Sequence, residues 1–162
     1  METLYKTPRL HLARSGYMVF SYFSQVSDME SLKATEAALK KVAKEHGRVL
    51  TLTHMSGSTV TDKVPDEVKV KAAAILRGVE GELVASAMVI TGEGIGVTIL
   101  RAFMTAFVIF SKIKRPQRVF ADLESALSWF RSLDATGVGD LRAETVERYM
   151  KLAQGSTGAR VA

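Results

Sequence analysis

Residues 83–90 read LVASAMVI, a nearly unbroken apolar run. Such a run is typical of a central strand that is covered on both of its faces. The turn residues TGEG at 91–94 end the run, and the spacing of apolar residues after them predicts a long helix over residues 95–113. A doubly covered strand that leads directly into a helix indicates an α/β layer fold.

Further strands and helices are predicted on both sides of this run. Residues 10–14 and 17–24 are rich in aromatic and β-branched side chains and predict a β-hairpin. A capping box formed by Ser27 and Glu30 predicts that a helix begins at Ser27, and Gly47 is placed to end it. The remaining predicted elements are strands at 48–54 and 117–120 and helices at 65–79, 122–130 and 140–152.

The predicted order of elements is β-β-α-β-α-β-α-β-α with one appended helix. This alternation predicts an α/β fold, a single layered domain with a mixed, mostly parallel sheet of about five strands and a C-terminal helix. The domain is expected to span residues 1–153, and the Gly-rich, polar segment 154–162 is expected to be a flexible tail. With 162 residues, 47% of them apolar, the chain is long enough for one hydrophobic core.

The composition excludes several classes of site. The chain contains no cysteine, which rules out disulfides, thiolate zinc sites, iron–sulfur clusters and cysteine nucleophiles. Its net charge of +5 is spread along the whole sequence, so we expect no specific nucleic-acid partner. The N-terminal residues lack an apolar signal segment, and Arg101 interrupts the most apolar stretch, which is shorter than the roughly 20 residues of a membrane span. We therefore expect a cytoplasmic protein with no transmembrane segment.

No motif predicts a cofactor or a metal site. The glycines of GEGIG at 92–96 lie between a strand and a helix, where backbone amides can hold a phosphate. Their spacing fits neither a dinucleotide fingerprint nor a nucleotide-triphosphate loop, so a flexible turn is the preferred interpretation. No two of the three histidines have the spacing of a metal-ligand pair; they are His11, His46 and His54. His46 lies at the end of the predicted helix that Gly47 terminates, where its partial positive charge is favourable to the helix dipole.

His54 ends a predicted strand beside Ser56, Ser58, Thr59 and Asp62. A hydroxyl, an imidazole and a carboxylate are the groups of a nucleophilic relay, so a small hydrolase that uses His54 and Ser56 is one alternative. The Gly-x-Ser-x-Gly elbow that exposes such a serine is absent from the sequence. We therefore expect a non-enzymatic protein with no catalytic residues.

The predicted helix over residues 95–113 carries more apolar surface than one buried face requires. Its broad apolar face comprises Ile99, Leu100, Phe103, Phe107 and Phe110. Its second side carries Val97, Met104 and Val108 next to Arg101, where a surface helix would be polar. Either the domain buries most of this helix, or the second side meets another subunit, a lipid or a protein partner. The candidate residues for an interface or an apolar ligand are therefore Val97, Arg101, Met104 and Val108.

The order of elements and three short motifs resemble a STAS-type domain, the fold of sulfate transporters and anti-sigma factor antagonists. The motifs are MSGST at 55–59, the strand at 83–90 and the closing segment RVFADLESALSWF at 118–130. The closing segment is the most telling of them, because it joins a short strand to an acidic helix start and an Ala-Leu-x-Trp pattern. The resemblance covers about residues 16–133 and implies the same fold for this chain.

The resemblance also implies a function and a site. STAS-type domains act by binding other proteins, and the antagonist branch is switched when a Ser or Thr in a loop before a helix is phosphorylated. By position, Ser56, Ser58 and Thr59 are the corresponding candidates here. In this chain His54-Met55 stands where the family usually has an acidic residue, and several residues separate the hydroxyls from Pro65.

Two functions remain open from the sequence besides the hydrolase. The preferred one is a non-enzymatic regulatory or scaffold domain that acts through protein contacts and forms a homodimer through the helix at 95–113. The alternative is a small carrier of a lipid or another apolar ligand, because folds related to the STAS type hold lipids in an apolar pocket.

Overall fold

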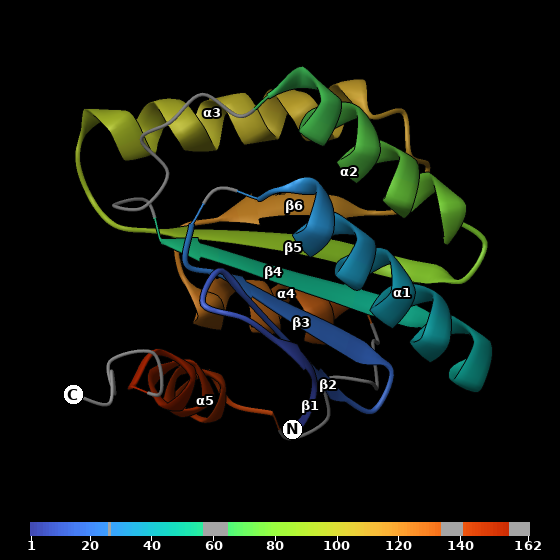
Figure 1. Cartoon of the computed structure of the whole chain (residues 1–162). Helices are drawn as coiled ribbons and strands as arrows, with labels where there is room; N and C mark the ends of the chain where they lie inside the picture. Colours follow the sequence, from blue (N-terminus) through green and yellow to red (C-terminus); the bar gives the residue numbers. More distant parts are fainter. Residues whose placement is uncertain (26, 57–64, 134–140, 156–162) are drawn as a thin grey trace.

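Six strands form one mixed sheet whose spatial order follows the sequence, β1-β2-β3-β4-β5-β6 (Figure 1). The computed structural model describes residues 1–25, 27–56, 65–133 and 141–155. The strands are β1 (Glu2–Lys6), β2 (Leu10–Ser15), β3 (Met18–Phe23), β4 (Val49–Ser56), β5 (Leu83–Thr91) and β6 (Gln117–Phe120). The helices are α1 (Met29–His46), α2 (Asp66–Gly78), α3 (Ile95–Phe110), α4 (Leu123–Ser132) and α5 (Ala143–Gly155).

β2 pairs antiparallel with both β1 and β3, and β3, β4, β5 and β6 run parallel. The predicted α/β class and mostly parallel mixed sheet are confirmed, with six strands in place of about five. The additional strand is β1, which pairs with β2 at the edge of the sheet. Its side chains are partly or fully exposed, so it lacks the apolar alternation by which a strand is identified in a sequence.

The helices form two layers, one on each side of the sheet (Figure 1). Three parallel crossovers, through α1, α2 and α3, advance in one direction across the sheet. Because such crossovers are right-handed, all three helices lie on the same face. The opposite face is covered by α4, which contacts β5 and β6, and α5 packs beside α4.

The two faces of the sheet have different side chains. Alternate residues of β4 point to opposite faces, so Leu50 and Leu52 face the α4 side while Thr51 and Thr53 face α1, α2 and α3. The α4 side carries Leu50 and Leu52, which belong with Phe130 to the hydrophobic core, and the buried His54 lies on the same face farther along β4. The serine and threonine side chains at the middle of β3, β4 and β5 lie on the other face.

Local capping explains where the helices begin and end. The Oδ1 atom of Asp28 accepts a hydrogen bond from the Ser31 amide at 2.8 Å, so Asp28 caps α1. The predicted capping box at Ser27 is wrong by one residue, because the carboxylate of Asp28 satisfies the same free amides. Gly47 ends α1 in the left-handed conformation with φ of 67°, as predicted. Asp122 caps α4 in the same way as Asp28 caps α1, through the Ser125 amide.

The last two helices follow the predicted pattern with shifted ends. The apolar stripe of α4, formed by Leu123, Ala126, Leu127 and Phe130, is buried as predicted. The final helix, α5, continues to Gly155, two residues into the segment predicted as a flexible tail, and residues 156–162 lie outside the described part of the chain. Among the helices that the structure describes, none combines the length and the apolar character needed to cross a membrane.

We predict that Gly47→Ala lowers the free energy of unfolding by about 1 kcal/mol, because an alanine Cβ disfavours the left-handed conformation. Urea unfolding followed by circular dichroism measures the change. The matched control is Gly78→Ala at the end of α2, where a Cβ also meets open space and φ is not positive. That variant should gain about 0.5 kcal/mol, and equal losses in both would contradict the explanation.

Candidate functional site

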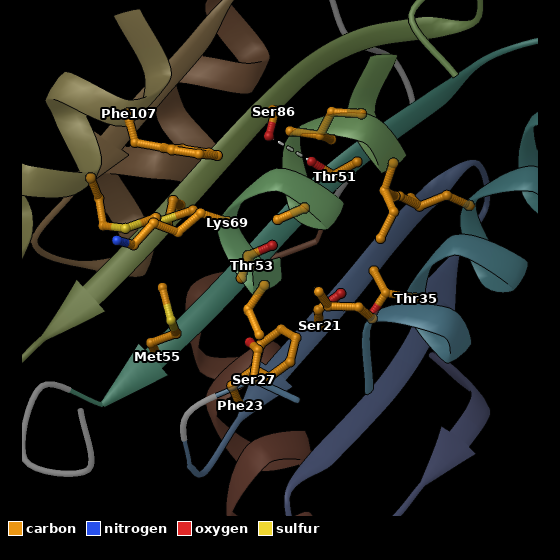
Figure 2. Close-up of a pocket in the computed structure, with 18 of the residues that line it drawn as sticks. Ser21, Phe23, Ser27, Thr35, Thr51, Thr53, Met55, Lys69, Ser86 and Phe107 are labelled. Atoms are coloured by element: carbon orange, nitrogen blue, oxygen red, sulfur yellow. Dashed lines mark hydrogen bonds between the residues drawn. The ribbon is translucent and has the colours of Figure 1, made fainter. Parts of the chain in front are cut away.

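A cavity of about 140 Å³ lies between the sheet and the helix layer. Its floor is formed by β3, β4 and β5, its walls by α1 and α2, and its roof by α3 (Figure 2). The floor side chains are Ser21, Phe23, Thr51, Thr53, Met55, Ser86 and Met88. The roof side chains are Leu100, Phe103, Met104 and Phe107. The cavity therefore has an apolar roof and a floor that contains several hydroxyl groups.

The register of the parallel strands brings the floor residues together. Ser21, Thr53 and Met88 are direct neighbours across β3, β4 and β5. Two residues earlier in β4 and β5, Thr51 Oγ1 donates a hydrogen bond to Ser86 Oγ at 2.7 Å (Figure 2). Serine and threonine are short, so they leave space beneath α3 that longer aliphatic residues at these positions would fill.

Two hydroxyls of the floor remain without a partner in the described part of the chain. Ser21 Oγ and Thr53 Oγ1 both belong to cavity-lining residues, and neither makes a hydrogen bond there. Ser21 is only 3% exposed. Because neither oxygen is engaged by the described residues, both hydroxyls are available to hydrogen-bond to an oxygen atom of a bound molecule.

Lys69 is the one charged residue among the described residues that line the cavity. Its Nζ atom lies 2.6 Å from Asp66 Oδ1 and 5.3 Å from the centroid of the Phe103 ring. Asp66 is almost fully exposed, so this ion pair is screened by solvent. Because Lys69 belongs to α2 and Phe103 to α3, a positive charge lies between the two helices at the boundary of the cavity.

Arg101 ties α3 to the end of β5. Its Nε atom donates to the carbonyl oxygen of Ile90 at 2.9 Å, and its Nη2 atom donates to that of Gly92 at 2.8 Å. These two bonds hold the Arg101 side of the helix toward the sheet. Arg101 is thus an anchor of the cavity roof, a role that its position on an apolar helix did not reveal.

The rotation of α3 differs from the predicted one. The candidate residues Val97, Arg101, Met104 and Val108 lie on the side that faces the sheet, where Val97 is buried and Met104 lines the cavity. Of the predicted broad apolar face, Ile99 is 63% exposed, whereas Phe103 is 41% exposed and also lines the cavity. Leu100 and Phe107, which belong to the same predicted apolar face, line the cavity. A ligand or interface role of the four candidate residues stays a prediction.

An exposed apolar strip runs along the outer side of α3. Ile95, Ile99, Phe103 and Ile109 lie within about one third of the helix circumference, and Ile95, Ile99 and Ile109 are 82%, 63% and 70% exposed. We call these four residues the α3 strip. The sequence showed the surplus of apolar residues on this helix, but it indicated the opposite side as the free one.

His54 lies on the face of the sheet opposite to the cavity. It is buried, stacks on Tyr22 at a centroid distance of 5.5 Å, and its Nε2 atom is 3.3 Å from Thr91 Oγ1. Burial lowers the pKa of His54 to about 4, so its imidazole is neutral at pH 7. The hydroxyl paired with His54 is thus that of Thr91 and not that of Ser56.

Of the predicted hydroxyl cluster, only Ser56 is described. It is partly exposed at the end of β4, where a modifying enzyme can reach a side chain. Ser58, Thr59 and Asp62 lie outside the described residues. The phosphorylation site and the hydrolase relay therefore both stay predictions.

His11 connects α5 to the edge of the sheet. Its Nε2 atom lies 2.7 Å from the hydroxyl of Tyr149 and 3.2 Å from that of Thr3. Burial, and then the charge of Lys6, lower the pKa of His11. Residues more than 130 positions apart meet here, so nothing in the local sequence indicated the contact.

Two signals in the sequence could have located the cavity floor. Thr51 and Thr53 alternate with leucines in β4, and Ser86 interrupts the apolar run of β5. Hydroxyls at alternating positions of central strands point to one face, but they do not show whether a helix closes over them. Within the described residues, no group of three or more histidine, aspartate or glutamate side chains converges where a metal ion could bind.

No protein-family model, no curated protein and no solved structure matches this chain.

The burial of His54 predicts a pH-dependent stability. Because its folded-state pKa of about 4 lies below its unfolded value of about 6.5, the unfolded chain binds the proton more readily, and stability falls as the pH drops through this window. The free energy of unfolding attributable to His54 should be about 2 kcal/mol lower at pH 5 than at pH 7. Urea titrations of wild type and His54→Phe at both pH values measure this contribution.

The variant His54→Phe retains an aromatic ring against Tyr22 and removes the titrating group. Its stability should change less between pH 7 and pH 5 than that of the wild type. His46→Phe, which removes an exposed histidine, serves as the control and should leave the wild-type pH dependence intact. Identical pH profiles for wild type and His54→Phe would contradict the assignment.

Proposed function

We propose that this protein reversibly binds a small apolar or amphipathic molecule in the cavity beneath α3, as a carrier or a ligand-responsive domain. The observation that carries the proposal is the cavity itself, which is lined by residues of three strands and three helices and roofed by apolar side chains. Closely packed interiors rarely leave a void of this size, and clefts with an apolar lining and a few polar groups are the usual form of ligand sites.

The size of the cavity restricts the ligand. Its volume of about 140 Å³ is close to that of an apolar cavity of about 150 Å³ that holds one benzene molecule. Pockets for drug-sized ligands are larger, about 300–1,000 Å³. A two-chain lipid therefore exceeds the space, and the favoured ligand has an apolar part of about six to eight carbon atoms.

A filled cavity should no longer bind such a molecule. We predict that Ala72→Leu, which adds carbon atoms to a residue of the cavity wall, lowers the affinity for benzene at least tenfold. Benzene should raise the melting temperature of the wild type, because it binds the folded state. It should not raise the melting temperature of the variant.

Ala74→Leu is the matched control, because it makes the same change on the same helix at an exposed position. It should respond to benzene like the wild type. Circular dichroism verifies that both variants fold. A wild type that shows no stabilisation by benzene, toluene or hexane would contradict the proposed function.

A second candidate function, a regulatory or scaffold domain that acts through protein contacts, is favoured by the α3 strip. Large apolar side chains that lie together on a surface commonly mark an interaction site. The partner proposed here is a second copy of the chain, which would pair two such strips. The proposed STAS-type kinship and phosphorylation at Ser56 belong to this candidate, and the order of strands and helices supports the kinship.

This candidate predicts a homodimer that Ile99→Asp dissociates. A charge in the middle of the α3 strip would be buried in the dimer without a partner, so the dimer affinity should fall more than tenfold. Light scattering coupled to size-exclusion chromatography measures the mass. Thr105→Asp, an exposed polar position of the same helix, should leave the dimer intact. A monomeric wild type at high micromolar concentration would contradict self-association.

A further inference from the structure

We propose that the ligand of the cavity is a small aromatic carboxylic acid whose carboxylate pairs with Lys69 and whose single ring lies beneath Met104 and Phe107. This inference rests on the proposed binding function and adds the chemical class of the ligand.

The charge of the lining selects an anion. Among the described lining residues Lys69 is the one ionic group, and the other polar groups are hydroxyls of serine and threonine. An ammonium only donates hydrogen bonds, and a hydroxyl can donate one, so the complementary ligand presents oxygen acceptors. A carboxylate satisfies this requirement and neutralises the positive charge.

Lys69 is free to exchange its present partner for a ligand. Asp66, with a side chain that is 93% exposed, holds the ammonium at the surface of α2, and an exposed pair of this kind contributes little stability. The Lys69 side chain itself is mostly covered, and its ammonium lies near the Phe103 ring. A carboxylate at the cavity boundary would meet this ammonium where solvent screening is weaker than it is at Asp66.

The roof selects an aromatic ring. Phe107 points into the cavity in Figure 2, and Met104 lines the same roof. Offset or edge-to-face contacts with Phe107 and thioether contacts with Met104 both favour an aromatic ligand over an alkyl chain. One ring also matches the cavity volume.

The floor offers a second anchor at a distance from Lys69. In Figure 2 the Lys69 ammonium lies on the left side of the cavity, away from Ser21 and Thr35 on the right. The hydroxyls of Ser21 and Thr53 line the cavity, and among the described residues neither makes a hydrogen bond. A ring that carries a hydroxyl or carbonyl oxygen opposite its carboxylate would meet these groups.

Methionine methyl groups report on the site directly. Met55, Met88 and Met104 line the cavity, whereas Met18 and Met150 are buried elsewhere. Full-length protein labelled with ¹³C at the methionine methyls is titrated with benzoate, its neutral analogue benzamide, and benzene at pH 7. Ring-current shifts should affect the three cavity methyls and spare the other two. Benzoate should bind about tenfold more tightly than benzamide, since a charge-assisted hydrogen bond is added.

The variant Lys69→Met removes the charge and keeps the length of the side chain. It should weaken the binding of benzoate about tenfold more than it changes the binding of benzene. Lys33→Met, which removes one exposed charge from α1 outside the cavity, is the control and should bind benzoate like the wild type.

The outcomes separate the two proposals. Equal affinities for benzoate and benzamide, or equal weakening by Lys69→Met and Lys33→Met, would overturn the pairing with Lys69 and leave the binding function standing. Cavity methyls that none of the three compounds shifts would overturn both the pairing and the binding function. Lys69→Gln repeats the measurement should Lys69→Met fail to fold.

Discussion

The handedness of three successive crossovers governs the arrangement of this molecule. The chain leaves β3, β4 and β5 in turn and returns each time to a parallel neighbour on the same side, so right-handed connections place α1, α2 and α3 in one layer. The last of these helices reaches the edge of the sheet at β6. One side of α3 covers the sheet there, while the other side, which no described element covers, carries the α3 strip.

The sheet is packed closely on one face and loosely on the other. Toward α4, leucine and phenylalanine side chains fill the interior and make up much of the hydrophobic core. Toward α3, short hydroxyl side chains leave a void, and the hydrogen bond from Thr51 to Ser86 offsets part of the cost of burying them. The loosely packed face is the one that carries the cavity, which is consistent with the proposed function.

Much of the fold followed from local patterns in the sequence. The apolar run at 83–90 predicted a buried central strand, and the structure has β5 there. The apolar residues that begin at Leu123 predicted the buried face of α4. Gly47 marked the end of α1 because few other residues adopt the left-handed conformation. These predictions succeeded because each depends on neighbours within a few residues. The edge strand β1 was not predicted, because its exposed side chains do not alternate between apolar and polar residues.

By itself, the sequence determined the α/β class, the order of most elements, the surplus of apolar residues on α3 and the absence of cysteine chemistry. Only the tertiary structure decided which side of α3 faces the sheet, because apolar residues occupy several sides of that helix and periodicity cannot choose among them. In the structure, hydrogen bonds from Arg101 to Ile90 and Gly92 hold that side of α3 against the end of β5. The cavity and the neutral state of His54 also depend on tertiary structure, since both arise where residues distant in the sequence meet and exclude water.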